Sequence, residues 1–370
     1  MTIKKKVLFL GRLTPPVHGA ALMNERYLYS KLLNKNFNIR PIKINDSKSL
    51  NEIGKINFKK FLGFFKTCHK LIWELINFSP DLIYFEIAPK GFAFYRDSMF
   101  VLLSKLFNKR IVFNFQAKGI SKSANGLLSK AYYKFIFRKS KIVLLSWLVY
   151  PDAREVIKKE QVSIIQDSIY DELYESEFER IINRRKKNTN PNLLFLSNMI
   201  EHKGPLDVLN ICNELKKKNI KFTCNFIGPF SDEDFKKRFL KQIEKLNLSE
   251  SCFYIGAKYG KDRNKFLEKT DYLIFPTTHS EETLGLVMLE SLMYGIPILA
   301  YDNASIPEMI CEEYLGAVVP QGRWDELSKE LLRRLKTKED PRRIRDYFKK
   351  VCLFKYSEHK LSKVLSEAIK

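Results

Sequence analysis

Short apolar segments alternate with stretches of helical periodicity along nearly the whole chain, and this alternation constrains the fold more than any other feature. The first cycle is Val7 to Leu10, then Gly11, then apolar residues at helical spacing from Ala20 to Leu33. The further strands expected in the first part are 81–85, 110–115, 141–145 and 162–165, with helices at 98–107 and 127–137. Apolar strands that alternate with helices are typical of a parallel sheet covered on both faces.

A second series of the same kind follows a polar stretch at residues 169–191. The expected strands are 193–196, 222–227, 252–255, 271–275 and 297–301, and the expected helices are 205–218, 232–246, 261–269 and 284–294. A length of 370 residues also favours two domains. We therefore expect an α/β protein with two doubly wound, Rossmann-like domains, residues 1–168 and 192–354, joined by a linker at 169–191. The C-terminal helix, 355–370, is expected to join the first domain.

In doubly wound sheets, ligands bind at the carboxyl ends of the strands. The expected site is therefore a central cleft that the two domains face. The six cysteines occur singly, without a CxxC pair or metal-ligand spacing, so we expect reduced thiols, no disulfide and no metal.

Basic residues are concentrated in the first part of the chain. The formal net charge is +23, and residues 1–150 contain 27 Lys and Arg against 7 Asp and Glu, whereas the remainder contains 38 against 35. Such a field favours a polyanionic partner, either nucleic acid or an anionic membrane surface. A Lys-rich genome is the alternative explanation, although it should affect both halves alike.

No apolar stretch is long enough to span a bilayer; the longest, residues 142–150, is well short of the roughly 20 residues required. We therefore expect a soluble or peripheral protein. Residues 57–73 interleave bases with aromatics and favour a helix that lies on anionic lipid. The contacting side chains would include Lys59, Lys60, Phe61, Phe65 and Lys66. The alternative is a surface helix whose Phe residues pack into the core.

The loop after the first strand has features of an anion site. Gly19 would let the backbone approach an anion, and a helix that begins near Ala20 directs free N–H groups toward it, beside His18. The segment matches neither the GxGxxG pattern nor the phosphate loop pattern, and an ordinary turn between strand and helix is the alternative.

Two carboxylates near residue 285 form the more specific pattern. Glu282 is expected at the tip of a strand, Gly285 opens a helix, and Glu290 lies further along that helix. Carboxylates so placed could hold two hydroxyl-bearing parts of one ligand, while amides at the helix start hold its phosphates. A capping carboxylate with a solvated helix Glu is the alternative.

The segment from Glu282 to Glu290 resembles the E-x-F-G-x-x-x-x-E signature of the retaining family 4 glycosyltransferases, with Leu284 at the aromatic position. Other segments agree in order and separation, and the likeness covers nearly the whole chain. They are residues 15–19, residues 195–198 with Lys203 and Gly204, and residues 306–308. The resemblance implies the GT-B fold.

The resemblance also implies roles for single residues. Glu290 would hold the ribose of a nucleotide, Glu282 the hydroxyls of the donor sugar, and Lys203 the diphosphate, where a cation offsets the charge of the leaving group. The other residues expected to bind the donor are His18, Gly19, Asn198, Gly256, Thr283, Leu284 and Gly285.

Two positions depart from the family pattern. Asn198 stands where Arg is common, so the diphosphate would depend on Lys203 alone or on a further cation such as Arg12 or Lys118. Gln116 stands where a sugar-contacting His is expected. Its amide can hydrogen-bond a hydroxyl but cannot carry a proton at neutral pH.

The resemblance implies a hexosyltransferase that moves a sugar from a nucleotide-sugar, with UDP as the expected nucleotide, and retains the anomeric configuration. The acceptor would be a lipid-linked sugar or saccharide in surface polysaccharide assembly, such as capsule or O-antigen, at the inner face of the cell membrane. No bound metal or other cofactor is expected. Two alternatives stay open: a nucleotide-sugar epimerase of the same architecture, and a nucleic-acid-binding protein that uses the basic first half.

Overall fold

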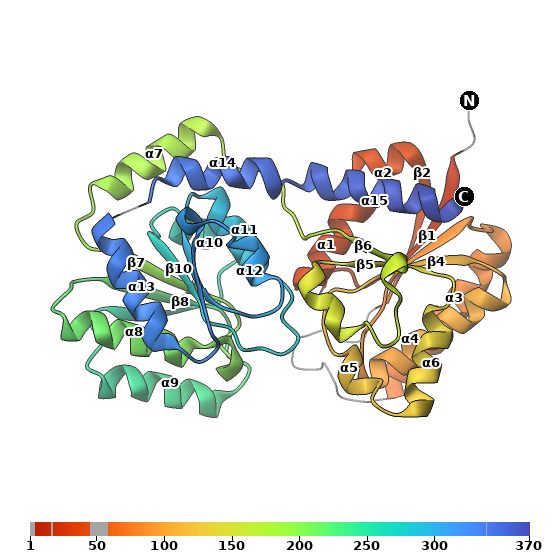
Figure 1. Ribbon diagram of the computed structural model, residues 1–370, viewed down its shortest axis with the longest axis horizontal. Coiled ribbons are helices and arrows are strands. Elements are labelled where there is room, and N and C mark those ends of the chain that lie inside the picture. The colour runs from red at the N-terminus through yellow and green to blue at the C-terminus, as the bar shows by residue number, and fades with distance from the viewer. Residues whose placement is uncertain (1–3, 16–17, 45–57, 338) are drawn as a thin grey trace. The chain divides into compact units, whose positions relative to one another are not determined.

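The computed structural model describes residues 4–15, 18–44, 58–337 and 339–370, and it describes no side chains for residues 58–61. The chain divides into two compact units, which are coloured along the sequence in Figure 1. Unit 1 consists of Met1–Ser168 and Phe354–Lys370, and unit 2 consists of Ile169–Leu353.

Unit 1 is built on a parallel sheet of six strands in the order β2-β1-β3-β4-β5-β6. The strands are β1 (Lys5–Gly11), β2 (Phe37–Lys43), β3 (Leu82–Glu86), β4 (Arg110–Asn114), β5 (Lys141–Leu144) and β6 (Val162–Ile164). Every residue of β3 is buried, as expected for a strand covered on both faces. The chain reverses direction across the sheet between β1 and β3, so the carboxyl ends of these two strands form the switch point of unit 1.

The helices of unit 1 connect these strands. They are α1 (Gly19–Leu28), α2 (Lys31–Asn36), α3 (Phe58–Asn77), α4 (Gly91–Leu106), α5 (Ile120–Ser123), α6 (Leu127–Phe137) and α15 (Phe354–Ile369), with short 3-10 turns η2 (Trp147–Asp152) and η3 (Lys159–Gln161). The single helix expected from Ala20 to Leu33 is two helices, because the Ser30 hydroxyl accepts a hydrogen bond from the Leu33 amide and starts a new helix. Helix α15 packs against β3, β4 and α2, which returns the end of the chain to unit 1.

Unit 2 contains a second parallel sheet of six strands, in the order β12-β11-β10-β7-β8-β9. The strands are β7 (Asn192–Leu196), β8 (Thr223–Ile227), β9 (Cys252–Gly256), β10 (Tyr272–Phe275), β11 (Ile298–Tyr301) and β12 (Gly316–Val319). The order is that of a dinucleotide-binding sheet, and its switch point lies between the neighbouring strands β7 and β10.

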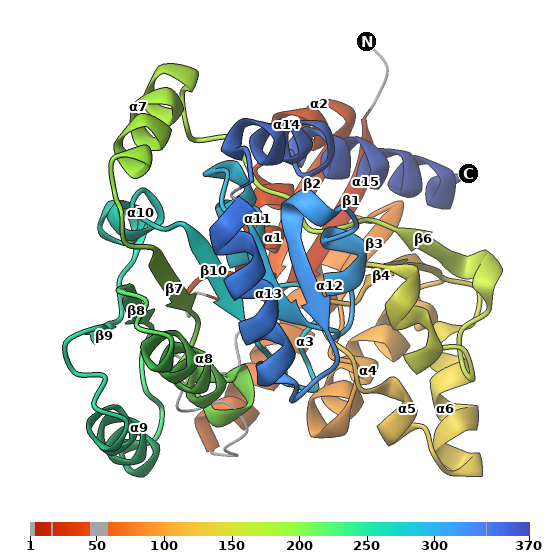
Figure 2. The same cartoon turned by 60° about the vertical axis from the view of Figure 1, so that its left-hand side comes forward.

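Helices cover both faces of the sheet of unit 2. They are α7 (Glu175–Lys186), α8 (Pro205–Lys217), α9 (Glu233–Lys245), α10 (Gly260–Leu267), α11 (Leu286–Met293), α12 (Ile306–Met309), α13 (Trp324–Thr337) and α14 (Pro341–Val351), with 3-10 turns η4 (Glu201–Lys203) and η5 (Glu313–Leu315). Successive residues of β7 pack on opposite faces of the sheet. Leu193 and Phe195 belong to the buried cluster on one face, and Leu194 belongs to the cluster on the other. Figure 2 shows α8, α9 and α13, which cover the first of these faces, as neighbours.

The prediction of a linker at residues 169–191 is wrong. Most of it forms helix α7, whose Phe178, Ile181 and Ile182 are buried in a core cluster of unit 2. The acids and bases that suggested a linker lie at the two ends of this helix, where they complement the helix dipole.

Among the described residues, no helix is both long enough and apolar enough to cross a membrane.

Candidate functional site

The loops that follow β7 and β10 meet at the switch point of unit 2. Gly204 has φ +80°, and a Cβ at this position would collide with the carbonyl oxygen of Pro276. Only glycine combines this backbone conformation with so close an approach. The contact places Lys203, the residue before Gly204, beside the loop that runs from Pro276 to Gly285.

Lys203 and Glu282 form the central pair of this site. The Lys203 Nζ donates a hydrogen bond to Glu282 Oε2, and the two side chains are only 15% and 10% exposed. Thr277 Oγ1 lies 3.4 Å from the same carboxylate oxygen, and the ammonium group lies 6.0 Å from the centre of the Phe275 ring. The two residues that the sequence assigned to the diphosphate and the sugar are therefore in direct contact.

The loop that carries Glu282 is fixed by the segment after β11. Asn303 Nδ2 donates to the carbonyl oxygens of Thr277, at 3.3 Å, and His279, at 3.0 Å, and the Ser305 amide donates to the Thr283 carbonyl at 3.1 Å. Glu282 is thus not at the tip of a strand, as expected, because β10 ends at Phe275 and a hydrogen-bonded loop intervenes.

His279 lies in the same loop and was not anticipated from the sequence. Its Nδ1 accepts a hydrogen bond from the Glu281 amide at 3.2 Å. Burial and, after it, the nearby charge of Lys203 lower the pKa of His279 below its usual value. The imidazole is therefore neutral at neutral pH, and Lys203 is the positive charge of this part of the site.

Glu290 lies on α11 and pairs with Arg263 of α10, whose guanidinium is 2.9 Å from the carboxylate. The Nε of Arg263 is buried and has no hydrogen-bond partner among the described residues. Nothing in the sequence singled out Arg263, because a lone Arg on an exposed, polar helix carries no motif. Asn303 and Ser305 were missed because single polar residues in the loop after β11 likewise carry no motif.

The start of α11 supplies backbone amides to the site. Gly285 packs against the Phe275 ring so closely that an added Cβ would lie 2.7 Å from it. In the described structure, no hydrogen bond uses the amides of Leu284 and Gly285, as is usual where a helix begins. The Leu284 side chain is buried in the core, so this residue can offer a ligand only its amide.

The remaining expected donor residues of unit 2 share the carboxyl edge of its sheet. Asn198 follows β7 and is exposed, and Gly256 ends β9 with φ +81° and open space around it. Thr283 is buried, and its carbonyl accepts from the Ser305 amide. Of the expected donor residues of unit 2, Lys203 and Glu282 are the pair that the structure brings into direct contact.

The expected residues of unit 1 lie in its own first loop. His18 caps α1, and its Nδ1 accepts from the Ala21 amide at 3.3 Å. Burial and the charge of Arg12 lower the pKa of His18. Arg12 forms ion pairs with Glu86, at 2.8 Å, and Asp97, at 3.2 Å. Asp97 also pairs with Arg96, so the guanidinium of Arg12 is engaged in an ion-pair network within unit 1.

Gln116 follows β4, and the buried Asp167 lies close enough for the Gln116 amide to affect its pKa. The Asp167 Oδ1 is buried without a hydrogen-bond partner among the described atoms. Burial raises the pKa of Asp167 to about 7, although Arg26 and Gln116 act in the opposite direction. Gln116 therefore lies near a carboxyl group that titrates near neutrality. Sequence reasoning did not identify Asp167.

Within the residues described, no group of three or more His, Cys, Asp or Glu side chains is arranged to hold a metal ion.

Residues 177–351 match the protein family described as glycosyl transferases group 1. A Klebsiella pneumoniae protein described as "Uncharacterized 41.2 kDa protein in cps region" is 32% identical over 129 residues, which are 35% of this chain and 32% of that protein. The amylovoran biosynthesis glycosyltransferase AmsK of Erwinia amylovora is 23% identical over 145 residues, 38% of this chain and 35% of AmsK. The chain thus spans about a third of the length of these curated relatives.

Solved structures match over nearly the whole chain. A glycosyltransferase from Rickettsia africae ESF-5 has a TM-score of 0.75 and 16% identity and covers 99% of both chains. Anabaena Alr3699/HepE in complex with UDP has a TM-score of 0.73 and 14% identity, over 98% of this chain and 100% of that one. The expected fold, two Rossmann-like domains of the GT-B type, is confirmed.

Proposed function

We propose that this chain, which has the GT-B fold and whose residues 177–351 match glycosyl transferases group 1, transfers a hexose from a UDP-sugar with retention of the anomeric configuration. The acceptor is a lipid-linked sugar or a saccharide in surface polysaccharide assembly. The observation that carries this proposal is the largely buried pair of Lys203 and Glu282 beside the amides that begin α11.

This arrangement suits the departure of a nucleoside diphosphate. In the proposed step, the bond between the anomeric carbon and the diphosphate oxygen breaks. An acceptor oxygen then bonds to the same face of the sugar, and its proton passes to the departing diphosphate. Lys203 and the amides of Leu284 and Gly285 stabilise the charge that develops on the diphosphate, because they are fixed before the reaction begins.

The proposed donor contacts divide between the two glutamates. Glu290, held by Arg263 on the neighbouring helix, binds the ribose hydroxyls, and Glu282 binds hydroxyls of the sugar. Since Lys203 and the helix amides meet the charge of the diphosphate, we expect transfer without a bound metal and without a cofactor.

The relatives support the substrate classes. Anabaena Alr3699/HepE has been solved with UDP and with UDP-glucose. Two relatives are named for amylovoran and for colanic acid biosynthesis, and WaaG, with a TM-score of 0.68 and 14% identity, for lipopolysaccharide biosynthesis. These names favour a UDP-sugar as donor and a growing surface polysaccharide as acceptor.

Product analysis tests the proposal. The protein is incubated with UDP-sugars and lipid-linked saccharide acceptors in excess EDTA, and the anomeric configuration of the product is determined by NMR. The proposal requires a new glycoside with the configuration of the donor. Interconversion of the free UDP-sugar without an acceptor would instead identify an epimerase, and activity that returns only with added Mg²⁺ or Mn²⁺ would contradict the metal-free step.

We also propose that α3 holds the protein on the inner face of the membrane. Side chains are described from Leu62 onward, so Lys59, Lys60 and Phe61 lie outside them. Leu71 and Leu75 pack into unit 1, whereas four large apolar side chains are exposed on α3: Leu62, Phe65, Trp73 and Ile76. These four recur at helical spacing, with Lys66 exposed nearby, which is the pattern of a helix lying on anionic lipid.

A further inference from the structure

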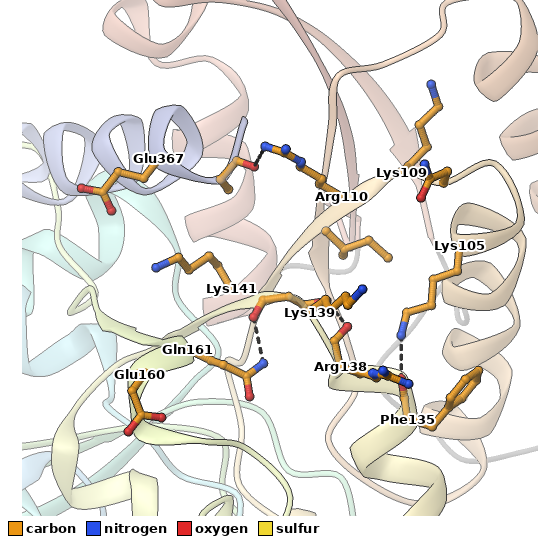
Figure 3. Close-up of a pocket in the computed structure, with 14 residues that line it drawn as sticks. Lys105, Lys109, Arg110, Phe135, Arg138, Lys139, Lys141, Glu160, Gln161 and Glu367 are labelled. Carbon is orange, nitrogen blue, oxygen red and sulfur yellow. Dashed lines mark hydrogen bonds between the residues drawn. The ribbon is translucent and has the colours of Figure 1, made fainter. Parts of the chain in front are cut away.

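Unit 1 contains a cavity at the amino-terminal edge of its sheet, which is the opposite edge from Arg12 and Gln116. The cavity has a volume of about 670 Å³. Its lining comes from the segments that lead into β4, β5 and β6 and from the end of α15 (Figure 3). We call it the amino-edge cavity.

Positive charge dominates the lining. It contains six bases and two acids: Lys105, Lys109, Arg110, Arg138, Lys139 and Lys141, with Glu160 and Glu367. Among the described residues, no ion pair joins any of these six bases to an acid. The span from residue 98 to residue 151, which supplies all six, contains ten Lys or Arg and no Asp or Glu.

The negative carboxyl ends of neighbouring helices offset only part of this positive charge. Helices α4, α6 and α15 end here, and Lys105 donates to the Phe135 carbonyl at 2.6 Å while Arg110 donates to the Ala368 carbonyl at 3.1 Å. Each helix end carries about −0.5 charge, so three ends offset roughly 1.5 charges. The six bases exceed the two acids by four charges, so more than two positive charges stay uncompensated.

The bases also repel one another. Burial and, after it, the charge of Arg138 lower the pKa of Lys105. In Figure 3, Lys141 lies apart from Lys105, Arg138 and Lys139, and all four line one common space. An anion in that space would relieve this repulsion.

We propose that the amino-edge cavity binds a phosphate-bearing anion, at a site separate from the one in unit 2. A phosphate monoester carries about −1.5 to −2 charges at neutral pH, which is close to the positive charge left uncompensated on the lining. Arg and Lys are side chains that bind phosphate in many proteins, and the volume is in the range of small-molecule sites. The phosphate belongs either to a free phosphorylated molecule or to a lipid headgroup.

Calorimetric titration with inorganic diphosphate tests whether the cavity binds a free phosphate-bearing molecule. The double variant Lys139→Ala/Lys141→Ala should bind at least about tenfold more weakly than the wild type, a loss of about 1.4 kcal/mol. The control Lys31→Ala/Lys35→Ala removes the same charge from α2, outside the cavity, and should bind as the wild type does. Lys203 is unchanged in all three proteins, so diphosphate bound in unit 2 contributes equally. Equal melting temperatures show that folding is intact, and Lys139→Arg/Lys141→Arg should restore binding.

Flotation with phosphatidylcholine vesicles, with and without phosphatidic acid, tests the headgroup form. If the headgroup is the ligand, the wild type and the control should float only with phosphatidic acid, and the cavity variant should float less. Weaker binding by the cavity variant in either experiment supports the site. The experiment in which the loss occurs shows whether the phosphate belongs to a free molecule or to a lipid headgroup. If neither diphosphate binding nor flotation changes in the cavity variant, or if the control loses as much, the proposal is overturned.

Discussion

Glu282 holds the ammonium group of Lys203, so a diphosphate that binds Lys203 competes with a carboxylate. The variant Glu282→Gln removes that competitor and should bind UDP at least as tightly as the wild type. Its rate of transfer should nevertheless fall, by about 10²–10³-fold if Glu282 contributes as much as one preorganised polar group typically does. Calorimetry with UDP and a transfer assay measure the two effects.

Glu290 should behave in the opposite way. Glu290→Gln removes the charged acceptor proposed for the ribose hydroxyls, and hydrogen bonds to charged groups contribute about 1.5–3 kcal/mol. UDP affinity should therefore fall by about tenfold or more. A similar loss of UDP affinity in Glu282→Gln and Glu290→Gln would refute the division of roles between the two glutamates.

Asp167 makes the stability of unit 1 depend on pH. Burial raises its pKa from an ordinary 3.8 to about 7, so the folded state binds a proton that the unfolded state has lost. Stability therefore falls as pH rises between about 4 and 7, by on the order of 1–4 kcal/mol.

Asp167→Asn removes this titration and should be more stable than the wild type at pH 8, with the difference vanishing at pH 4. Denaturant unfolding at both pH values measures it, and a difference that does not change with pH would show that Asp167 does not titrate in this window.

At the scale of elements, α3 has two different faces: its Leu71 face packs into unit 1, and its Trp73 face is exposed. Trp73→Ser/Ile76→Ser should weaken flotation with anionic vesicles and leave the melting temperature unchanged, because both side chains are at least half exposed. The control Leu240→Ser/Phe253→Ser changes exposed apolar residues of unit 2 and should float like the wild type. Undiminished flotation of the α3 variant would remove this helix from the membrane contact.

Most elements could be predicted from the sequence, because buried parallel strands are short apolar runs. Strand β2 was missed, since it alternates polar residues and contains Pro41, which is tolerated only because β2 is an edge strand. Helix α7 was taken for a linker, because its buried Ile181 and Ile182 are outnumbered by charged residues.

Residues of the candidate site could be proposed from the sequence where they lie within one motif, whereas the contacts that the tertiary structure assembles could not. Glu282, Gly285 and Glu290 share one segment, so their spacing was informative. The contacts of Lys203 with Glu282, of Arg263 with Glu290 and of Asn303 with the loop join separate elements. Such contacts depend on the order of strands β7, β10 and β11 in the sheet, which periodicity does not encode.

At the scale of the whole molecule, the charge asymmetry follows the two units. The acid-free span of residues 98–151 lies in unit 1, whereas the proposed donor residues Lys203, Glu282 and Glu290 lie in unit 2. Binding to anionic vesicles should therefore weaken as salt rises, because surface charges are screened beyond about 8 Å at physiological ionic strength. UDP binding should depend less on salt, since Lys203 and Glu282 are largely buried. Parallel titrations at low and high salt measure both, and an equal salt dependence would contradict this separation.

Calorimetric titration of UDP into the protein in excess EDTA tests whether unit 2 holds a nucleoside diphosphate at Lys203. The wild type should bind UDP at this site. Lys203→Ala should weaken binding by at least about tenfold, about 1.4 kcal/mol, whereas Lys221→Ala, at an exposed lysine of the same unit, should leave it unchanged. Absence of UDP binding in the wild type, or equal affinity in the wild type and Lys203→Ala, would rule out a diphosphate site at Lys203.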